Sequence, residues 1–225
     1  MGASPSVLPW PSLDRFTRTH AATPTLLFGP LGLGLAVVGG GALGWGRAAA
    51  LVVAGYVAWT LAEYWIHRIA YHCVAPIRFG PRVQWMIHGV HHDHPSDEGR
   101  PMTPPLVSLP PLVAVIWLLC STLGSGTGPA VAGGFTLGYL SHELVHHHLH
   151  RRRPTTRLGR YLRRCHMRHH FRDERTWFGV TCPYWDYVFG TTGRGRGVQH
   201  IRPLVVGRQG WPPRTRPASP RETER

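Results

Sequence analysis

The chain has 225 residues and a formal net charge of +14, with 25 basic residues, all of them arginine, against 11 acidic ones. A length of this order indicates one domain. The charge would suit nucleic acid, but no motif with interleaved aromatic residues accompanies it, so we expect no nucleic-acid partner and assign the arginines to a membrane surface. The four cysteines are scattered without CxxC spacing, which argues against a disulfide framework and favours a reduced, cytoplasmic setting.

Two apolar segments follow a polar, Pro-containing stretch, residues 1–24, which we expect to be an interfacial segment. Residues 25–45 carry no charge and have about the 20 residues needed to cross a bilayer. Residues 48–66 form a second apolar run, and only two residues separate it from the first. So short a connection predicts a helical hairpin that returns the chain to its starting side.

The end of the second segment carries Glu63, followed by His67 and His72. Glu63 lies four residues before His67 and therefore on the same helical face. Since a carboxylate in a membrane segment is costly and usually functional, we expect Glu63 to accept a hydrogen bond from a ligand imidazole. His67 and His72 are about 140° apart on a regular α-helix, so we predict that the helix ends or bends between them.

No charged residue occurs over residues 101–141, a stretch too long for one crossing and interrupted by Gly and Pro at residues 124–129. We predict a third membrane helix over residues 106–123 and a fourth over 130–145. Four crossings place every histidine-rich segment on one side, where most arginines also lie, and the positive-inside bias makes that side cytoplasmic. The Pro/Arg-rich residues 196–225 are expected to form a disordered tail.

The pattern HxxHH occurs twice, at residues 88–92 and 166–170, and two spaced histidine pairs accompany it. Residues three and four apart share a helical face, so each HxxHH directs three imidazoles the same way. A lone histidine is usually structural, but this many at ligand spacing predicts a metal site. The predicted ligands are His67, His72, His88, His91, His92, His146, His150, His166, His169 and His170. His142 is either a further ligand or a neighbour that positions one.

The number of ligands bears on the metal. Zinc sites close with about four ligands, whereas ten imidazoles suit two ions with about five each and an open position. Imidazole binds Zn, Cu, Fe and Ni, so the ligand type does not choose among them. The higher coordination favours iron, and we predict two Fe ions that activate O2. Zinc can replace iron in a purified sample because of the affinity order of these metals.

Two longer motifs extend this pattern: E-Y-x-x-H-R-x-x-x-H at residues 63–72 and H-G-x-H-H-x-x-P-x-D at residues 88–97. With them the chain resembles the fatty acid hydroxylase superfamily of membrane di-iron oxygenases, which also holds sterol desaturases. F-G-V-T-x-x-x-W-D-x-V-F-G-T at residues 178–191 is most similar to the fatty acid 2-hydroxylase branch. The resemblance covers residues 63–191. It implies the same ten ligands, a cap of cytoplasmic helices over a membrane bundle, and an acyl chain that enters from the lipid.

The chain departs from that branch next to the third histidine pair. His142-Glu143 stands where the branch has Tyr-Asp, and Arg151 stands where it has a further histidine. We predict that the carboxylates of Glu63 and Glu143 support the catalytic site. No fused cytochrome-b5-like domain is expected within residues 1–24. The electrons would therefore come from a separate donor, a ferredoxin or a cytochrome-b5-like protein with its reductase.

These observations predict an all-α, multi-pass integral-membrane protein, in which residues 25–195 form a four-helix bundle with a cytoplasmic helical cap that holds the di-iron site. The predicted activity is O2-dependent hydroxylation of a fatty acyl chain near its carboxyl end. A hydroxylase of sterol or carotenoid rings, or a desaturase, would use the same ligands. A metal transporter is the alternative outside enzymes, but transporters place ligands near the bilayer midplane, whereas most of these lie past the helix ends. A lipid-binding scaffold is the remaining alternative.

Overall fold

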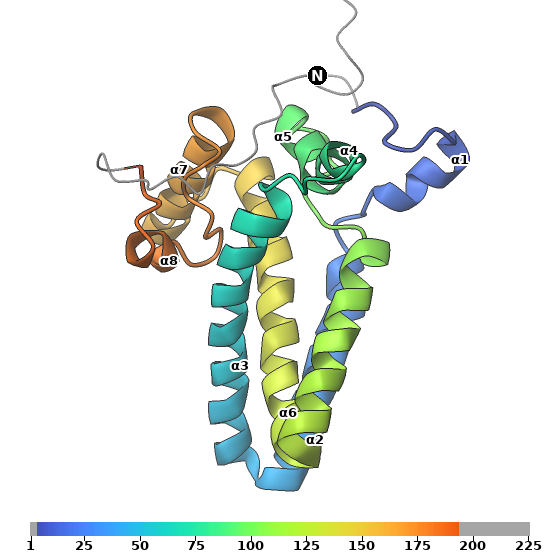
Figure 1. Ribbon diagram of the computed structural model, residues 1–225. Helices are drawn as coiled ribbons and strands as arrows, with labels where there is room; N and C mark the ends of the chain where they lie inside the picture. The colour runs from blue at the N-terminus through green and yellow to red at the C-terminus, as the bar shows by residue number, and fades with distance from the viewer. Residues whose placement is uncertain (1–3, 194–225) are drawn as a thin grey trace, which may run out of the picture.

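The computed structural model describes residues 4–193, and this part of the chain is helical, without a β-strand (Figure 1). The all-α prediction is confirmed over these residues, and the predicted tail lies outside them. The helices are α1 (Pro11–Asp14), α2 (Thr23–Leu43), α3 (Trp45–Trp65), α4 (Gly80–Gln84), α5 (Val90–Asp93), α6 (Pro105–Arg151), α7 (Arg157–Phe171) and α8 (Tyr184–Val188). A 3-10 turn follows α1 (η1, Arg15–Thr17), and two π-helices, η2 (Ile66–Tyr71) and η3 (Trp85–Gly89), precede α4 and α5.

Three of these helices are long and apolar enough to cross a membrane: α2, α3 with its extension to Tyr71, and α6. The 47-residue α6 is broken at Gly124, whose φ of 82° and ψ of 174° are not helical. A Cβ added at Gly128 would lie 2.5 Å from the Cα of Cys120, so the chain reverses direction at the break. The predicted third and fourth helices are the two halves of α6. One glycine with a positive φ makes the turn within residues 124–129, where the sequence predicted a break.

Glycines allow α3 and the second half of α6 to approach closely. A Cβ at Gly55 would lie 2.0 Å from the Val131 carbonyl oxygen, and one at Gly134 would lie 1.9 Å from that of Val52. Helices in lipid associate largely through such close backbone packing, because apolar contact with lipid is equally available elsewhere. Gly55 and Gly134 are therefore packing residues.

The core at the upper end of the helices draws one residue from each helical segment. Phe28 comes from α2, Trp59 from α3, Leu112 from the first half of α6 and Tyr139 from the second. The Tyr139 ring packs edge-on against Phe28 and Trp59, with ring centroids 4.8 and 5.1 Å apart. This contact fixes the relative positions of α3 and the second half of α6 just below the predicted ligands.

The helices α4, α5, α7 and α8 lie beyond the ends of α3 and α6, and we call this group the cap (Figure 1). Within the cap, α7 and α8 lie on one side and α4 and α5 on the other. The N-terminal segment is joined to the cap by Asp97. The carboxylate of Asp97 accepts hydrogen bonds from the Ser4 amide at 2.7 Å and from the Arg18 guanidinium at 2.8 Å. Burial raises the pKa of Asp97, but these bonds outweigh it and hold the pKa below its ordinary value. These hydrogen bonds thus hold the segment that the sequence predicts to be interfacial against the cap.

Candidate metal centre

Two widened helical turns present the first ligands. His67 lies within η2, a π-helix that His72 terminates, and π-helical hydrogen bonds join residues five apart. Two side chains five positions apart therefore meet on one face, although a regular α-helix would separate them. The predicted end or bend of the helix is replaced by a wider turn. His88 lies in η3, a second π-helix, which leads directly into α5 with His91 and His92.

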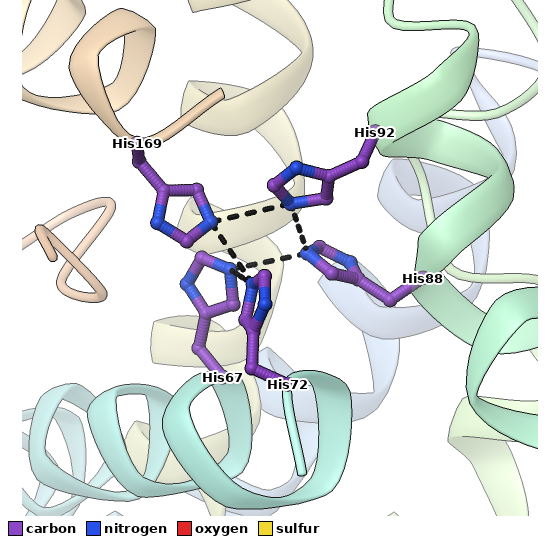
Figure 2. Close-up of side chains that lie close together, drawn as sticks. All are labelled: His67, His72, His88, His92 and His169. Atoms are coloured by element: carbon purple, nitrogen blue, oxygen red, sulfur yellow. Dashed lines mark hydrogen bonds between the residues drawn. The ribbon is translucent and has the colours of Figure 1, made fainter. Parts of the chain in front are cut away.

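The ten predicted histidines come together in two groups of five. The first cluster consists of His67, His72, His88, His92 and His169, whose rings converge in Figure 2. The second cluster consists of His91, His146, His150, His166 and His170. Within each cluster the potential ligand nitrogens all lie within 4.8 Å of one another. Each HxxHH motif contributes to both clusters, so the two sites share helices and lie side by side.

The hydrogen-bond partners of the ring nitrogens in the first cluster suit a bound cation. The Nδ1 of His67 lies 2.6 Å from the Phe178 carbonyl oxygen, and that of His169 lies 2.7 Å from the Thr176 oxygen. A neutral imidazole has one N–H, so Nε2 of both rings is a bare acceptor. The Nε2 of His72 faces both of these atoms, at 3.3 and 3.0 Å, and has at most one proton to donate. Acceptors that converge in this way fit a bound metal ion.

The second cluster has the same character. The Nε2 atoms of His150 and His166 are 2.7 Å apart, and those of His91 and His146 are 3.0 Å apart. Both nitrogens of His170 are buried without a hydrogen-bond partner among the described residues. Buried polar atoms are normally satisfied, so an unpaired ring among four other imidazoles also fits a metal ligand.

The cluster histidines of the cap have lowered pKa values, which favours the neutral form that binds metals. Burial lowers the pKa of His92 to about 3. Burial and the neighbouring imidazoles hold the pKa of the other buried cap ligands well below 6.5, namely His72, His88, His91, His166 and His169. Neither cluster therefore has to lose protons from these side chains before it binds a metal.

Glu63 and Glu143 are fully buried but do not contact the ligand rings in the expected way. Glu63 accepts hydrogen bonds from the amides of Val180 at 2.6 Å and Thr181 at 2.8 Å. The imidazole nearest to Glu63 is that of His142, which belongs to neither cluster, with its Nδ1 at 3.5 Å. Glu143 accepts from the amide of Thr103 at 3.0 Å. Glu63 therefore orients the loop over the first cluster and does not set a ligand tautomer directly.

The comparison with known proteins agrees with this geometry. The fatty acid hydroxylase family model matches residues 52–191, more than half of the chain. The chain belongs to the fatty acid hydroxylase family. The match includes all ten histidines of the two clusters, and the resemblance seen in the histidine motifs is confirmed.

Characterised family members include 2-hydroxylases. A dihydroceramide fatty acyl 2-hydroxylase of Arabidopsis thaliana is 37% identical over 142 residues, which are 63% of this chain and 60% of the relative. The human fatty acid 2-hydroxylase is 33% identical over 148 residues, 63% of this chain and 39% of the relative. The chain thus spans three fifths or less of the length of these relatives. The solved structure of full-length scs7p, with only its hydroxylase domain visible, has a TM-score of 0.79 at 27% identity and covers 85% of this chain and 72% of that one.

The structure adds a supporting residue that the histidine pattern did not indicate. Asp186, in the W-D-x-V-F-G-T motif of this family member, is completely buried. The carboxylate accepts hydrogen bonds from the amides of Phe178 at 2.8 Å and Gly179 at 2.9 Å, and from the Thr191 hydroxyl at 2.7 Å. The segment that it folds carries the Phe178 carbonyl, which orients His67. The sequence signal for this role was an acidic residue, Asp186, within the aromatic-rich motif at residues 178–191.

Replacing Glu63 or Glu143 by Gln should lower metal affinity or activity by about 10–100-fold, the range for groups that orient ligands. In Glu63→Gln, the side-chain oxygen can still accept from the Val180 and Thr181 amides, but an NH2 replaces the oxygen that accepts from the Thr181 hydroxyl, and the negative charge that strengthens all three bonds is lost. Metal retention during dialysis against a chelator would measure the effect. Glu98→Gln is the matched control, because the Glu98 side chain is 74% exposed and pairs only with Arg151 among the described residues. Wild-type metal retention and activity in both buried variants would contradict a supporting role.

Proposed function

We propose that the chain is an integral-membrane di-iron oxygenase that hydroxylates a fatty acyl chain near its carboxyl end, at the 2-position. The observation that carries this proposal is the pair of five-imidazole clusters at the ends of apolar helices. A bound iron pair supplies O2 activation and the oxidation of an unactivated C–H bond. Two of the relatives are named as a fatty acyl 2-hydroxylase and a fatty acid 2-hydroxylase, and these names support the same reaction class.

The chain's own contribution is to bind the acyl chain beside the metals and to exclude water. A cavity reaches both clusters, with His67 and His88 from the first and His91 and His146 from the second in its wall. Met86 and Met102 also line it. Flexible thioether side chains suit a chain of methylene groups. The cavity thus places two methionine side chains beside both clusters, where the proposed substrate would be held.

The depth of the site favours oxidation near the polar end of the substrate. We propose that α2, α3 and the two halves of α6 form a four-helix membrane bundle with the cap on the cytoplasmic side, in keeping with the positive-inside bias. The clusters then lie near the lipid headgroups. An acyl chain that rises from the bilayer presents the carbons next to its carboxyl group there, while its tail stays in hydrocarbon.

Lipid analysis of a host that expresses the protein tests this proposal. New 2-hydroxy acyl chains should appear with the wild type and vanish with His92→Ala, which removes a ligand of the first cluster. His148→Ala is the matched control, since His148 is exposed and belongs to neither cluster. A new double bond, or an oxidised ring lipid with unchanged acyl chains, would instead assign the desaturase or the ring hydroxylase activity.

A further inference from the structure

A continuous row of positive charge runs along the outer face of α7. Five exposed arginines at spacings of three and four form this row, which we call the arginine stripe: Arg157, Arg160, Arg164, Arg168 and Arg172. The opposite face of α7 buries Leu162 and Cys165 together with the ligand histidines. Residues three or four apart lie next to each other on a helix surface, so the stripe follows the whole length of the helix.

The charges of the stripe are not neutralised within residues 4–193. The arginine ion pairs in that part of the chain join Arg18 to Asp14 and Asp97, Arg100 to Asp14, Arg151 to Glu98 and Arg175 to Asp173. Like charges four residues apart repel each other and destabilise a helix. An unneutralised row of this length therefore indicates a negatively charged partner outside these residues.

The stripe is separated from both metal sites by a single helix. The inner face of α7 supplies His169 to the first cluster and His166 and His170 to the second. A helix with its side chains is about 10–12 Å across, so a protein bound to the stripe lies roughly one helix diameter from both ions. Weak electron-transfer complexes use small, charged contact surfaces of this kind.

The reaction requires such a partner if the proposed function holds. Hydroxylation by one oxygen atom of O2 consumes two electrons and two protons, because R–H + O2 + 2 electrons + 2 H⁺ gives R–OH + H2O. We propose that the arginine stripe of α7 is the docking surface for an acidic one-electron carrier protein, which delivers the two electrons one at a time. Charge complementarity steers such a partner and sets its orientation.

A protein fits the stripe better than the membrane surface does. Elsewhere on the cap, exposed arginines are interleaved with exposed apolar side chains, as at Ile77, Arg78 and Phe79, a pattern suited to the lipid interface. On α7, the large exposed apolar residues are Leu158 and Phe171, one near each end of the helix. The surface between them is polar and charged, which suits a hydrated contact.

Binding of the full-length, iron-loaded protein in nanodiscs to an acidic [2Fe–2S] ferredoxin tests the docking surface. The double variant Arg160→Gln/Arg164→Gln should bind about tenfold more weakly than wild type and with a smaller salt dependence. Arg78→Gln/Arg82→Gln is the matched control, which removes two exposed arginines from the other side of the cap and should leave binding unchanged. Basic cytochrome c should not bind, because its charge has the wrong sign.

Equal ferredoxin affinity for the wild type and the two double variants overturns the proposal, as does a lack of wild-type binding to both the ferredoxin and an acidic cytochrome b5. A loss confined to vesicles of anionic lipid would also overturn it and assign the stripe to the membrane. A chemical reductant tests the hydroxylase activity without the carrier protein. With dithionite, wild type and the α7 double variant should form equal amounts of product. No product from either protein would contradict the hydroxylase proposal, and the binding measurement would still test the docking surface.

Discussion

Metal analysis of the protein expressed in iron-rich medium should give two irons per chain, and His169→Ala should reduce this number towards one. His169 is a member of the first cluster, whereas the second cluster keeps all five of its imidazoles in this variant. His166→Ala should remove the other ion. Because losing a group that only orients a ligand already costs up to about 100-fold, removing a ligand should lower activity by at least about that factor.

His148→Ala is the control for both variants, since this exposed histidine lies on α6 between the ligands His146 and His150. It should retain two ions and full activity. One ion in the wild type, together with a harmless His166→Ala, would contradict the two-metal site. A zinc pair in the purified protein would not, because an imidazole site made for iron also binds zinc by the affinity order.

The clustering of most of these histidines was predictable because spacing along a helix determines which side chains share a face. The two HxxHH motifs and the His146/His150 pair rest on this periodicity, and the structure brings all of them into the two clusters. The spacing of His67 and His72 does not fit an α-helix. Their convergence depends on the π-helix η2, a local widening for which periodicity alone gives no signal.

The apolar segments were predictable from length and absence of charge, but their packing was not. The reversal at Gly124 needs one positive φ, and many other glycines lie in the same apolar runs without one. Polar contacts between residues far apart in the sequence were equally unpredictable. Asp97 and Arg18 are 79 residues apart in sequence, and nothing local to either residue indicates that they form an ion pair. Local sequence patterns therefore predict which helices form, but they do not predict which distant segments contact each other.

Asp186→Ala should empty the first cluster while leaving metal in the second. The substitution removes the acceptor for two buried amides and one hydroxyl, those of Phe178, Gly179 and Thr191. Each unsatisfied buried donor costs about 1–3 kcal/mol, so the folded segment should lose roughly 3 kcal/mol or more. The Phe178 carbonyl would then no longer hold His67 in the orientation that exposes its bare Nε2.

The selectivity follows from where the hydrogen bonds go. The segment around Asp186 contacts the first cluster through two carbonyls, Phe178 to His67 and Thr176 to His169. In the described residues, no hydrogen bond joins that segment to a ligand of the second cluster. Metal content near one ion per chain, with a helical circular dichroism spectrum like that of wild type, is the expected result. Asp173→Asn is the control, a partly exposed carboxylate in a nearby turn. Equal loss of both ions at unchanged helicity would show instead that Asp186 supports the two clusters alike.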